Sequence, residues 1–318
     1  MALSLQEKIL DPNQGVYLIG TTPPKSGTEQ EKVKRIATKL LDRLHEIEYD
    51  GVVVYDIQDE SSRTNVPRPF PFKETVDPCE YSRLVKSLSQ LDVITYKSVT
   101  QRDSAEFTQW LSTTKQEFGL NNLVLVGSPS SQGKINLPLP EAYQAFAQHE
   151  ENFFLGGVTI AERHASKRNE HERLIEKTTQ GCEFFISQAV YNAQATIDLI
   201  TSYARTCKQQ GIEPKRLILT FTPCGGEKTL QFMEWLGISV PEATKWRMLD
   251  ADNTLSESIR ICRENLDSIL RSCAHLDVPL GLNIESLTNR KEEIDASINL
   301  YRLLKATMEL TLAEKQIA

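Results

Sequence analysis

The chain has 318 residues, of which 40% are hydrophobic and 25% charged, and it carries a formal net charge of −7. This composition is typical of a soluble globular protein, and a net negative charge without a lysine- and arginine-rich stripe argues against nucleic acid as a partner. No stretch approaches the roughly 20 consecutive apolar residues of a membrane span, so we expect no membrane interaction.

The start of the chain and its cysteines bear on the cellular compartment. The first residues show no apolar core followed by a cleavage site, as a signal peptide would. The six cysteines include no Cys-x-x-Cys pair. In a long chain without a signal peptide, such cysteines are expected to be reduced and buried, which predicts a cytoplasmic protein.

Apolar runs predict eight strands, and helical patterns separate them. The predicted strands cover residues 15–20, 51–57, 92–99, 122–127, 153–160, 184–186, 216–222 and 279–285. The predicted helices cover residues 28–48, 78–91, 103–118, 140–149, 169–179, 193–210, a stretch beginning at 225, 252–274 and 288–313. An extra helical segment containing Trp235, Pro241 and Trp246 precedes the last strand.

Strands that alternate with helices, without a linker or a change of composition, predict an α/β fold. We expect residues 1–318 to form a single (β/α)8 TIM barrel domain. The alternative, an open doubly wound sheet in two domains, would need a linker that the sequence does not show.

The carboxyl ends of the strands are where chemistry collects in such a barrel. Glu162, Arg163 and His164 follow the fifth strand in a predicted polar turn, where they would bind a substrate carboxylate or a cofactor phosphate, or form a salt-bridge network on the rim. Gln188 presents both a donor and an acceptor, which suits a pterin or nicotinamide edge, or else it is a core glutamine bonded to a neighbouring strand. Further candidates at strand ends are Gly20, Asp56, Tyr96, Lys97, Ser128, Tyr191, Thr222, Asn283 and Glu285.

Two other chemistries find less support. Lys97 stands at a strand end, where some barrels carry a Schiff-base lysine, but a solvated or salt-bridged lysine is the more common finding. No cluster of histidine, cysteine and carboxylate has the spacing of metal ligands, so no metal site is predicted.

The stretch from Ala161 to Tyr191 resembles the fifth and sixth strands of the methylenetetrahydrofolate reductases. Its Ala-Glu-Arg-His and its Phe-Phe-Ile-Ser-Gln-Ala-Val-Tyr are similar to the family's Pro-Glu-x-His turn and Ile-Thr-Gln-aromatic strand end. Pro23-Pro24-Lys25 after the first strand and Ser286–Arg290 at the opening of the last helix are similar as well. This family reduces 5,10-methylenetetrahydrofolate to 5-methyltetrahydrofolate in one-carbon metabolism and methionine biosynthesis, with hydride passed from NAD(P)H through FAD.

The resemblance implies roles for individual residues. Gln188 would contact folate or nicotinamide, and Tyr191, Asn283 and Ser128 are the other residues expected to bind substrate. His164 and Lys177 would lie toward the flavin ribose and phosphates, with Arg163 as a further cofactor-binding residue.

Departures from the family pattern change the expected chemistry. The family's catalytic glutamate falls on Gly20, the aspartate near its flavin on Ser128, an arginine beside that aspartate on Val126, and a phosphate-binding arginine on Glu176. We therefore expect FAD affinity to be weak or absent. Glu162 and Asp56 are the carboxylates expected to replace the missing general acid, whose loss typically costs about 10²–10⁴ in rate.

The leading hypothesis is an oxidoreductase of the methylenetetrahydrofolate reductase type that uses NAD(P)H, with tetrahydrofolate compounds as its small-molecule partners. One alternative is a non-catalytic folate- or flavin-binding paralogue, acting as an accessory subunit of a reductase or a methyltransferase system. Another is a barrel enzyme that uses tetrahydrofolate in a different methyl or methylene transfer. A homo-oligomer and a complex with a methyltransferase system both remain open.

Overall fold

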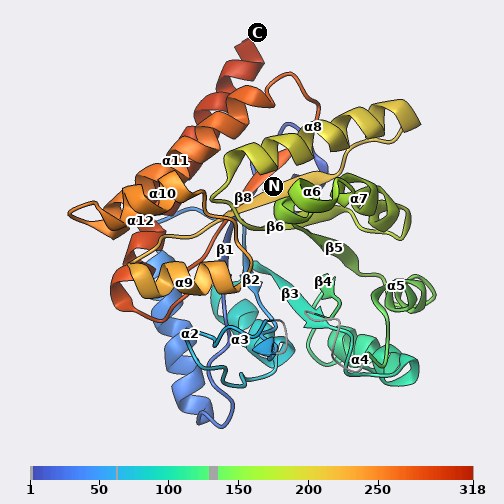
Figure 1. Cartoon of the computed structure of the whole chain (residues 1–318). Coiled ribbons are helices and arrows are strands. Elements are labelled where there is room, and N and C mark those ends of the chain that lie inside the picture. Colours follow the sequence, from blue (N-terminus) through green and yellow to red (C-terminus); the bar gives the residue numbers. More distant parts are fainter. Residues whose placement is uncertain (1–2, 62–63, 129–134, 318) are drawn as a thin grey trace. The chain divides into compact units, whose positions relative to one another are not determined.

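The computed structural model describes residues 3–61, 64–128 and 135–317, and its strands form a closed barrel in the order β1 to β8 (Figure 1). These strands are β1 (Tyr17–Thr21), β2 (Gly51–Val54), β3 (Asp92–Ser98), β4 (Asn122–Val126), β5 (Phe154–Thr159), β6 (Phe184–Ala189), β7 (Arg216–Phe221) and β8 (Leu280–Ile284). The pairs from β2 to β5 and from β6 to β8 are parallel. The predicted (β/α)8 barrel is confirmed.

The helices follow the predicted pattern, with two additions. They are α1 (Leu5–Leu10), α2 (Gln30–Leu44), α3 (Pro78–Ser89), α4 (Ser104–Gln116), α5 (Leu139–Ala147), α6 (Ala161–Lys167), α7 (Glu170–Thr179), α8 (Ala193–Gln210), α9 (Glu227–Trp235), α10 (Glu242–Leu249), α11 (Thr254–Ser272) and α12 (Lys291–Ile317). The short helices α1 and α6 have no counterpart among the predicted elements. The extra segment before β8 contains the end of α9 and the whole of α10. None of the described helices is long and apolar enough to cross a membrane.

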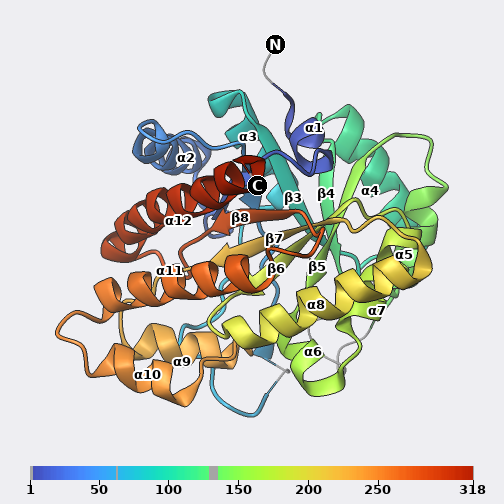
Figure 2. The same cartoon turned by 90° about the horizontal axis from the view of Figure 1, so that it is seen from above.

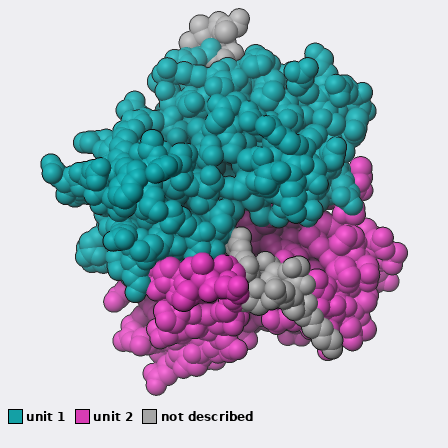
Figure 3. Space-filling view, viewed as in Figure 1, with its two compact units in different colours: residues 1–18, 159–178, 184–318 teal, residues 19–158, 179–183 magenta. Residues whose placement is uncertain are grey.

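The chain divides into two compact units, which Figure 3 shows in different colours. Unit 1 comprises residues 1–18, 159–178 and 184–318, and unit 2 comprises residues 19–158 and 179–183. The single domain expected over residues 1–318 therefore stays a prediction.

In unit 2, alternate strand residues face the helices. Val52 and Val54 of β2 belong to the core cluster that contains residues of α2 and α3. The Thr95 hydroxyl of β3 donates to the Ser82 hydroxyl of α3 at 2.8 Å. Because neighbouring residues of a strand point to opposite faces, Tyr55 and Tyr96 lie on the face turned away from these helices.

In unit 1, a buried arginine joins the amino-terminal helix to the strands. The Arg216 side chain, 1% exposed, begins β7 and donates to backbone carbonyls of α1 and of the turn that follows it. It also donates to the Leu280 carbonyl of β8. Helices α11 and α12, in the carboxyl-terminal part of the chain, lie side by side (Figures 1 and 2).

Candidate functional site

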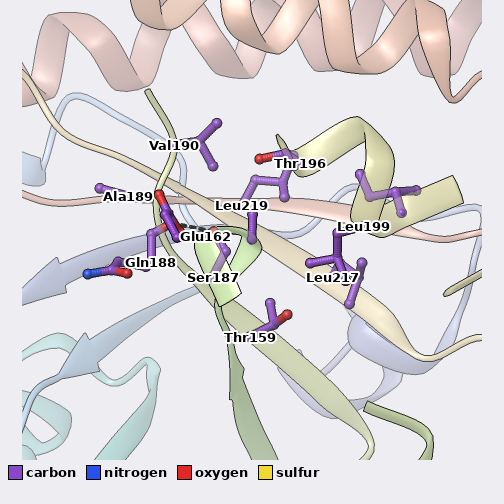
Figure 4. Close-up of a pocket in the computed structure, with 12 residues that line it drawn as sticks. Thr159, Glu162, Ser187, Gln188, Ala189, Val190, Thr196, Leu199, Leu217 and Leu219 are labelled. Carbon is purple, nitrogen blue, oxygen red and sulfur yellow. Dashed lines mark hydrogen bonds between the residues drawn. The ribbon is translucent and has the colours of Figure 1, made fainter. Parts of the chain in front are cut away.

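Strand β7 in unit 1 packs one of its two faces against helix α8. Leu217 and Leu219 of β7 line a cavity together with Thr196 and Leu199 of α8 (Figure 4). The volume of this cavity is about 10 Å³, which is room for roughly one water molecule. It is a gap in the packing between sheet and helix, and a folate-sized ligand does not fit there.

The other face of β7 and β8 carries a hydrogen-bonded polar pair. Since Leu217 and Leu219 face the helix, Ile218 and Thr220 face the opposite way, toward the barrel interior. Parallel pairing sets Thr220 opposite Asn283 of β8, and the Asn283 Nδ2 donates to the Thr220 Oγ1 at 3.1 Å. Both side chains are buried. The predicted substrate residue Asn283 therefore lies on the interior face.

A β-bulge positions Gln188 at the end of β6. The β6–β7 register shifts between Ile186 and Ala189. The Ser187 hydroxyl donates to the Gln188 carbonyl at 2.8 Å and accepts from the Thr220 amide at 2.9 Å. In Figure 4 the Gln188 carboxamide points away from Leu199, Leu217 and Leu219. A bulge that re-aims one side chain at a strand end is a frequent device beside binding sites.

Gln188 and Glu162 both bind the backbone of residues 236–239, the segment between α9 and α10. The Gln188 Nε2 donates to the Leu236 carbonyl at 2.8 Å, and the Glu162 Oε1 accepts from the Ser239 amide at 3.0 Å. The Asn192 side chain adds a bond to the Ser239 hydroxyl at 3.3 Å. Gln188 is thus bonded to this segment and not to a neighbouring strand, and the bond uses one of its two amide hydrogens.

The predicted polar turn after β5 is wrong, because Glu162, Arg163 and His164 lie in helix α6. The buried carboxylate of Glu170 fixes the start of this helix by accepting from the Ile160 amide at 3.0 Å. Its second oxygen accepts from the Arg163 guanidinium at 2.8 Å. Arg163 therefore forms an ion pair, as the alternative of a salt-bridge network predicted. Its role in cofactor binding stays a prediction.

Three other predicted residues are buried. His164 is 1% exposed and packs edge-on against His171, and its ring nitrogens have no hydrogen-bond partner among the described residues. Burial, together with His171, lowers the pKa of His164. The Tyr191 hydroxyl donates to the Thr222 carbonyl at 2.8 Å, and burial raises its pKa. Lys177 is 8% exposed on α7. The roles predicted for these three side chains toward substrate and cofactor stay predictions.

The strand ends of unit 2 present an aromatic pair. Tyr55 and Tyr96 meet edge-to-face, with ring centroids 4.9 Å apart. Asp56 lies at the next position, and its Oδ2 accepts from the Ser98 amide at 2.8 Å. Ser128 is half-buried just after β4. The predicted roles of Asp56 as an acid and of Ser128 as a substrate ligand stay predictions.

Lys97 lies on the helix-facing side of β3. Its Nζ is 2.7 Å from the Asp77 carboxylate, which also caps helix α3. The salt-bridged alternative for Lys97 is confirmed. Among the described residues, no group of three or more histidine, cysteine or acidic side chains could hold a metal ion.

Sequence reasoning places Tyr96 and Glu285 at strand ends but leaves them out of the expected binding residues, and it gives Thr220 and Tyr55 no role in the site. The signal that finds them is strand alternation. Once one residue of a strand is known to face a helix, the residues on either side of it face the barrel interior, and so does every second residue beyond them. The sequence does not show which of the two sets faces inward.

Fold and strand-end polarity together define a (β/α)8 barrel with a candidate small-molecule site at the carboxyl ends of its strands. The chain has 34% identity and a TM-score of 0.82 to an uncharacterized protein from Clostridium thermocellum that binds two copies of 5-methyl-5,6,7,8-tetrahydrofolic acid. This similarity covers 95% of the chain and 99% of the other protein. The chain belongs to the same family as this Clostridium thermocellum protein.

More distant similarities concern other barrels. Dihydropteroate synthase from Xanthomonas albilineans in complex with 7,8-dihydropteroate has 10% identity and a TM-score of 0.46, covering 96% of the chain and 97% of that enzyme. N-(5′-phosphoribosyl)anthranilate isomerase from Pyrococcus furiosus has 11% identity and a TM-score of 0.45, covering 92% and 99%. These similarities are too weak to bear on function. No protein-family model and no curated protein matches the chain.

Partial burial of Glu162 leads to a prediction about stability and pH. Loss of hydration raises the pKa of this carboxyl group, and the bond from the Ser239 amide only partly offsets that rise. A raised pKa means that the contribution of Glu162 to stability is fully present below its unfolded pKa and is lost as pH rises through its folded pKa. Glu162→Gln, which stays neutral and keeps an oxygen for Ser239, should melt at a higher temperature than the wild type at pH 8.

Thermal melts at pH 4 and pH 8 check this expectation. At pH 4 the variant and the wild type should melt at nearly the same temperature, because both side chains are then largely neutral. Glu292→Gln, at an exposed position of α12, is the control and should show no such dependence on pH. A difference between Glu162→Gln and the wild type that is equal at both pH values would contradict the burial effect.

Proposed function

We propose that the chain binds a reduced folate, with 5-methyltetrahydrofolate as the ligand, at the carboxyl ends of the barrel strands. The observation that carries this proposal is the near full-length similarity, at 34% identity, to a protein that binds this compound. At that level of identity over 95% of the chain, a shared ligand class is the simplest expectation. Fold alone would not support it, since one barrel fold hosts many unrelated ligands.

The polar groups of unit 1 suit the pterin ring of such a ligand. A pterin presents alternating hydrogen-bond donors and acceptors along one edge, and a carboxamide can supply both. Gln188 at the end of β6 and Asn283 in β8 are carboxamides, and Asn283 lies on the interior face. Binding sites of this kind combine a few fixed polar groups with apolar walls.

Reduction of 5,10-methylenetetrahydrofolate with NAD(P)H is the finer proposal, and the resemblance of the stretch from Ala161 to Tyr191 to the reductases supports it. FAD has no part in it, because the residues at the corresponding positions do not fit this cofactor. Val126 offers no side-chain hydrogen bond, and the exposed carboxylate of Glu176 would repel a diphosphate. The proposed reaction therefore passes hydride from nicotinamide to the methylene carbon of the folate, while the bond from that carbon to N10 breaks and N10 takes up a proton. Glu162 and Asp56 are the candidate donors of that proton, and this chain also binds and orients the two reactants.

Calorimetric titration of the purified protein with 5-methyltetrahydrofolate tests the proposed binding. We expect saturable binding, with up to two ligands per chain, because the Clostridium thermocellum relative binds two copies of this compound. Folic acid, whose pterin ring is oxidised and planar, should bind more weakly. Absence of binding at millimolar ligand would reject the proposed function.

Two further measurements separate the finer proposal from its alternative. The isolated protein should be colourless, since we expect no bound flavin, and it should oxidise NADH or NADPH when 5,10-methylenetetrahydrofolate is added. A protein that binds 5-methyltetrahydrofolate but never oxidises the nicotinamide is a folate-binding accessory protein. Stoichiometric flavin in the isolated protein would contradict the direct transfer of hydride.

A further inference from the structure

Strand β8 carries an acidic residue at its carboxyl end. Glu285 directly follows Ile284, the last residue of β8, and its amide donates to the Phe221 carbonyl of β7 at 3.1 Å. Ladder bonding to β7 therefore continues as far as the amide of Glu285. Its side chain consequently falls on the same face of the strand as the side chain of Asn283, two residues earlier.

That face is the barrel interior. A Cβ added at Gly281, two positions before Asn283, would lie 3.3 Å from the Ile218 side chain, which faces away from the α8 cavity. Asn283 itself bonds the Thr220 hydroxyl. Gly281, Asn283 and Glu285 thus form a row that runs along the interior face toward the carboxyl end of the strand. Glu285, half-buried, is the outermost member of this row.

A carboxylate at this place has a specific chemical complement in a reduced folate. The pterin ring carries an N3–H and a 2-amino group side by side, both hydrogen-bond donors directed the same way. An ionised carboxylate has two acceptor oxygens and no donor, so it accepts from both groups at once. A carboxamide at the same place would accept from one group and oppose the other with its own N–H.

We propose that Glu285 is the residue that recognises the pterin ring, by accepting hydrogen bonds from its N3–H and 2-amino groups. This assignment rests on the proposed binding of reduced folate. It gives the two carboxamides of unit 1 a complementary part, since Gln188 and Asn283 can meet the carbonyl and the ring nitrogens that a carboxylate cannot bind. Specificity for a pterin with a 2-amino group then comes from the carboxyl end of β8. It does not depend on Glu162, Arg163 or His164, which follow β5.

Affinity measurements on Glu285→Gln test this assignment with two probes. The first is 5-methyltetrahydrofolate, and the second is its 2-desamino-2-methyl analogue, which lacks one of the two donors. We expect the variant to bind 5-methyltetrahydrofolate about 10- to 100-fold more weakly than the wild type, the range for loss of a charge-assisted bidentate contact. The variant and the wild type should bind the analogue with affinities that differ by less than about threefold.

Each outcome bears on one proposal only. If the wild type does not bind 5-methyltetrahydrofolate, the proposed function fails. If the wild type binds and Glu285→Gln binds equally well, or if the variant loses both probes to the same extent, the role of Glu285 is overturned. Glu292→Gln is the matched control and should bind as the wild type does. Should Glu285→Gln melt well below the wild type, Glu285→Asp, which keeps the carboxylate, should still prefer 5-methyltetrahydrofolate over the analogue.

Discussion

Replacement of Arg216 by methionine should destabilise the protein far more than replacement of an exposed arginine. The guanidinium donates to the carbonyls of Ile9 at 3.0 Å, Lys8 at 3.3 Å and Asp11 at 2.5 Å, and to the carbonyl of Leu280. A buried carbonyl left without its donor costs about 1–3 kcal/mol. Because several are left at once, we expect the free energy of unfolding to fall by at least about 3 kcal/mol.

Urea denaturation of Arg216→Met and of a matched surface variant measures this effect. Arg271 pairs with Asp267 at 3.0 Å, but its side chain is 79% exposed, so Arg271→Met should change stability by less than about 0.5 kcal/mol. Arg216→Lys keeps the charge without the planar fork and should fall between the two. A loss below about 1 kcal/mol for Arg216→Met would show that water replaces the guanidinium without difficulty.

Replacement of Gln188 by alanine should weaken binding of 5-methyltetrahydrofolate by about 5- to 150-fold, which corresponds to about 1–3 kcal/mol for a polar contact left unmet in a dry site. The fold should suffer less. Loss of the bond to the Leu236 carbonyl removes one anchor of the 236–239 segment, at a cost of about 0.5–1.5 kcal/mol. Calorimetry and a thermal melt of the same variant report the two effects separately.

Gln194→Ala is a suitable control for this variant. Gln194 is an exposed carboxamide on α8 that bonds Asp198, and its removal should affect neither quantity. If Gln188→Ala is strongly destabilised while its affinity for 5-methyltetrahydrofolate is unchanged, Gln188 serves only to anchor the 236–239 segment. Binding would then have to depend on other interior groups.

The order of strands and helices can be predicted from the sequence because each buried strand is a continuous apolar run that ends abruptly in polar residues. Helix α6 cannot, since its seven residues carry four charged or imidazole groups and no apolar stripe. What fixes its start is the carboxylate of Glu170, which lies beyond the helix in the chain and reaches back to the Ile160 amide. A contact of this kind leaves no periodic signal.

The candidate site can be predicted only in part. Polar residues at strand ends point to the region where Gln188 and Asn283 lie. Position along the chain does not reveal whether a strand-end side chain faces the interior or a helix. Lys97 and Asn283 look equivalent in the sequence, yet one bonds the cap of α3 and the other bonds Thr220 of the adjacent strand. Only the packing of the neighbouring helices makes that distinction.

The bond between Gln188 and the Leu236 carbonyl restricts how the ligand preference of this barrel can be altered by design. A glutamate at position 188 would set a negative oxygen against that carbonyl, and an apolar residue would release it, so either change disturbs the 236–239 segment in addition to any ligand contact. The hydroxyl of Thr220, by contrast, is held by Asn283 within the barrel. A library intended to alter ligand choice should therefore vary positions 220 and 283 together and leave position 188 constant.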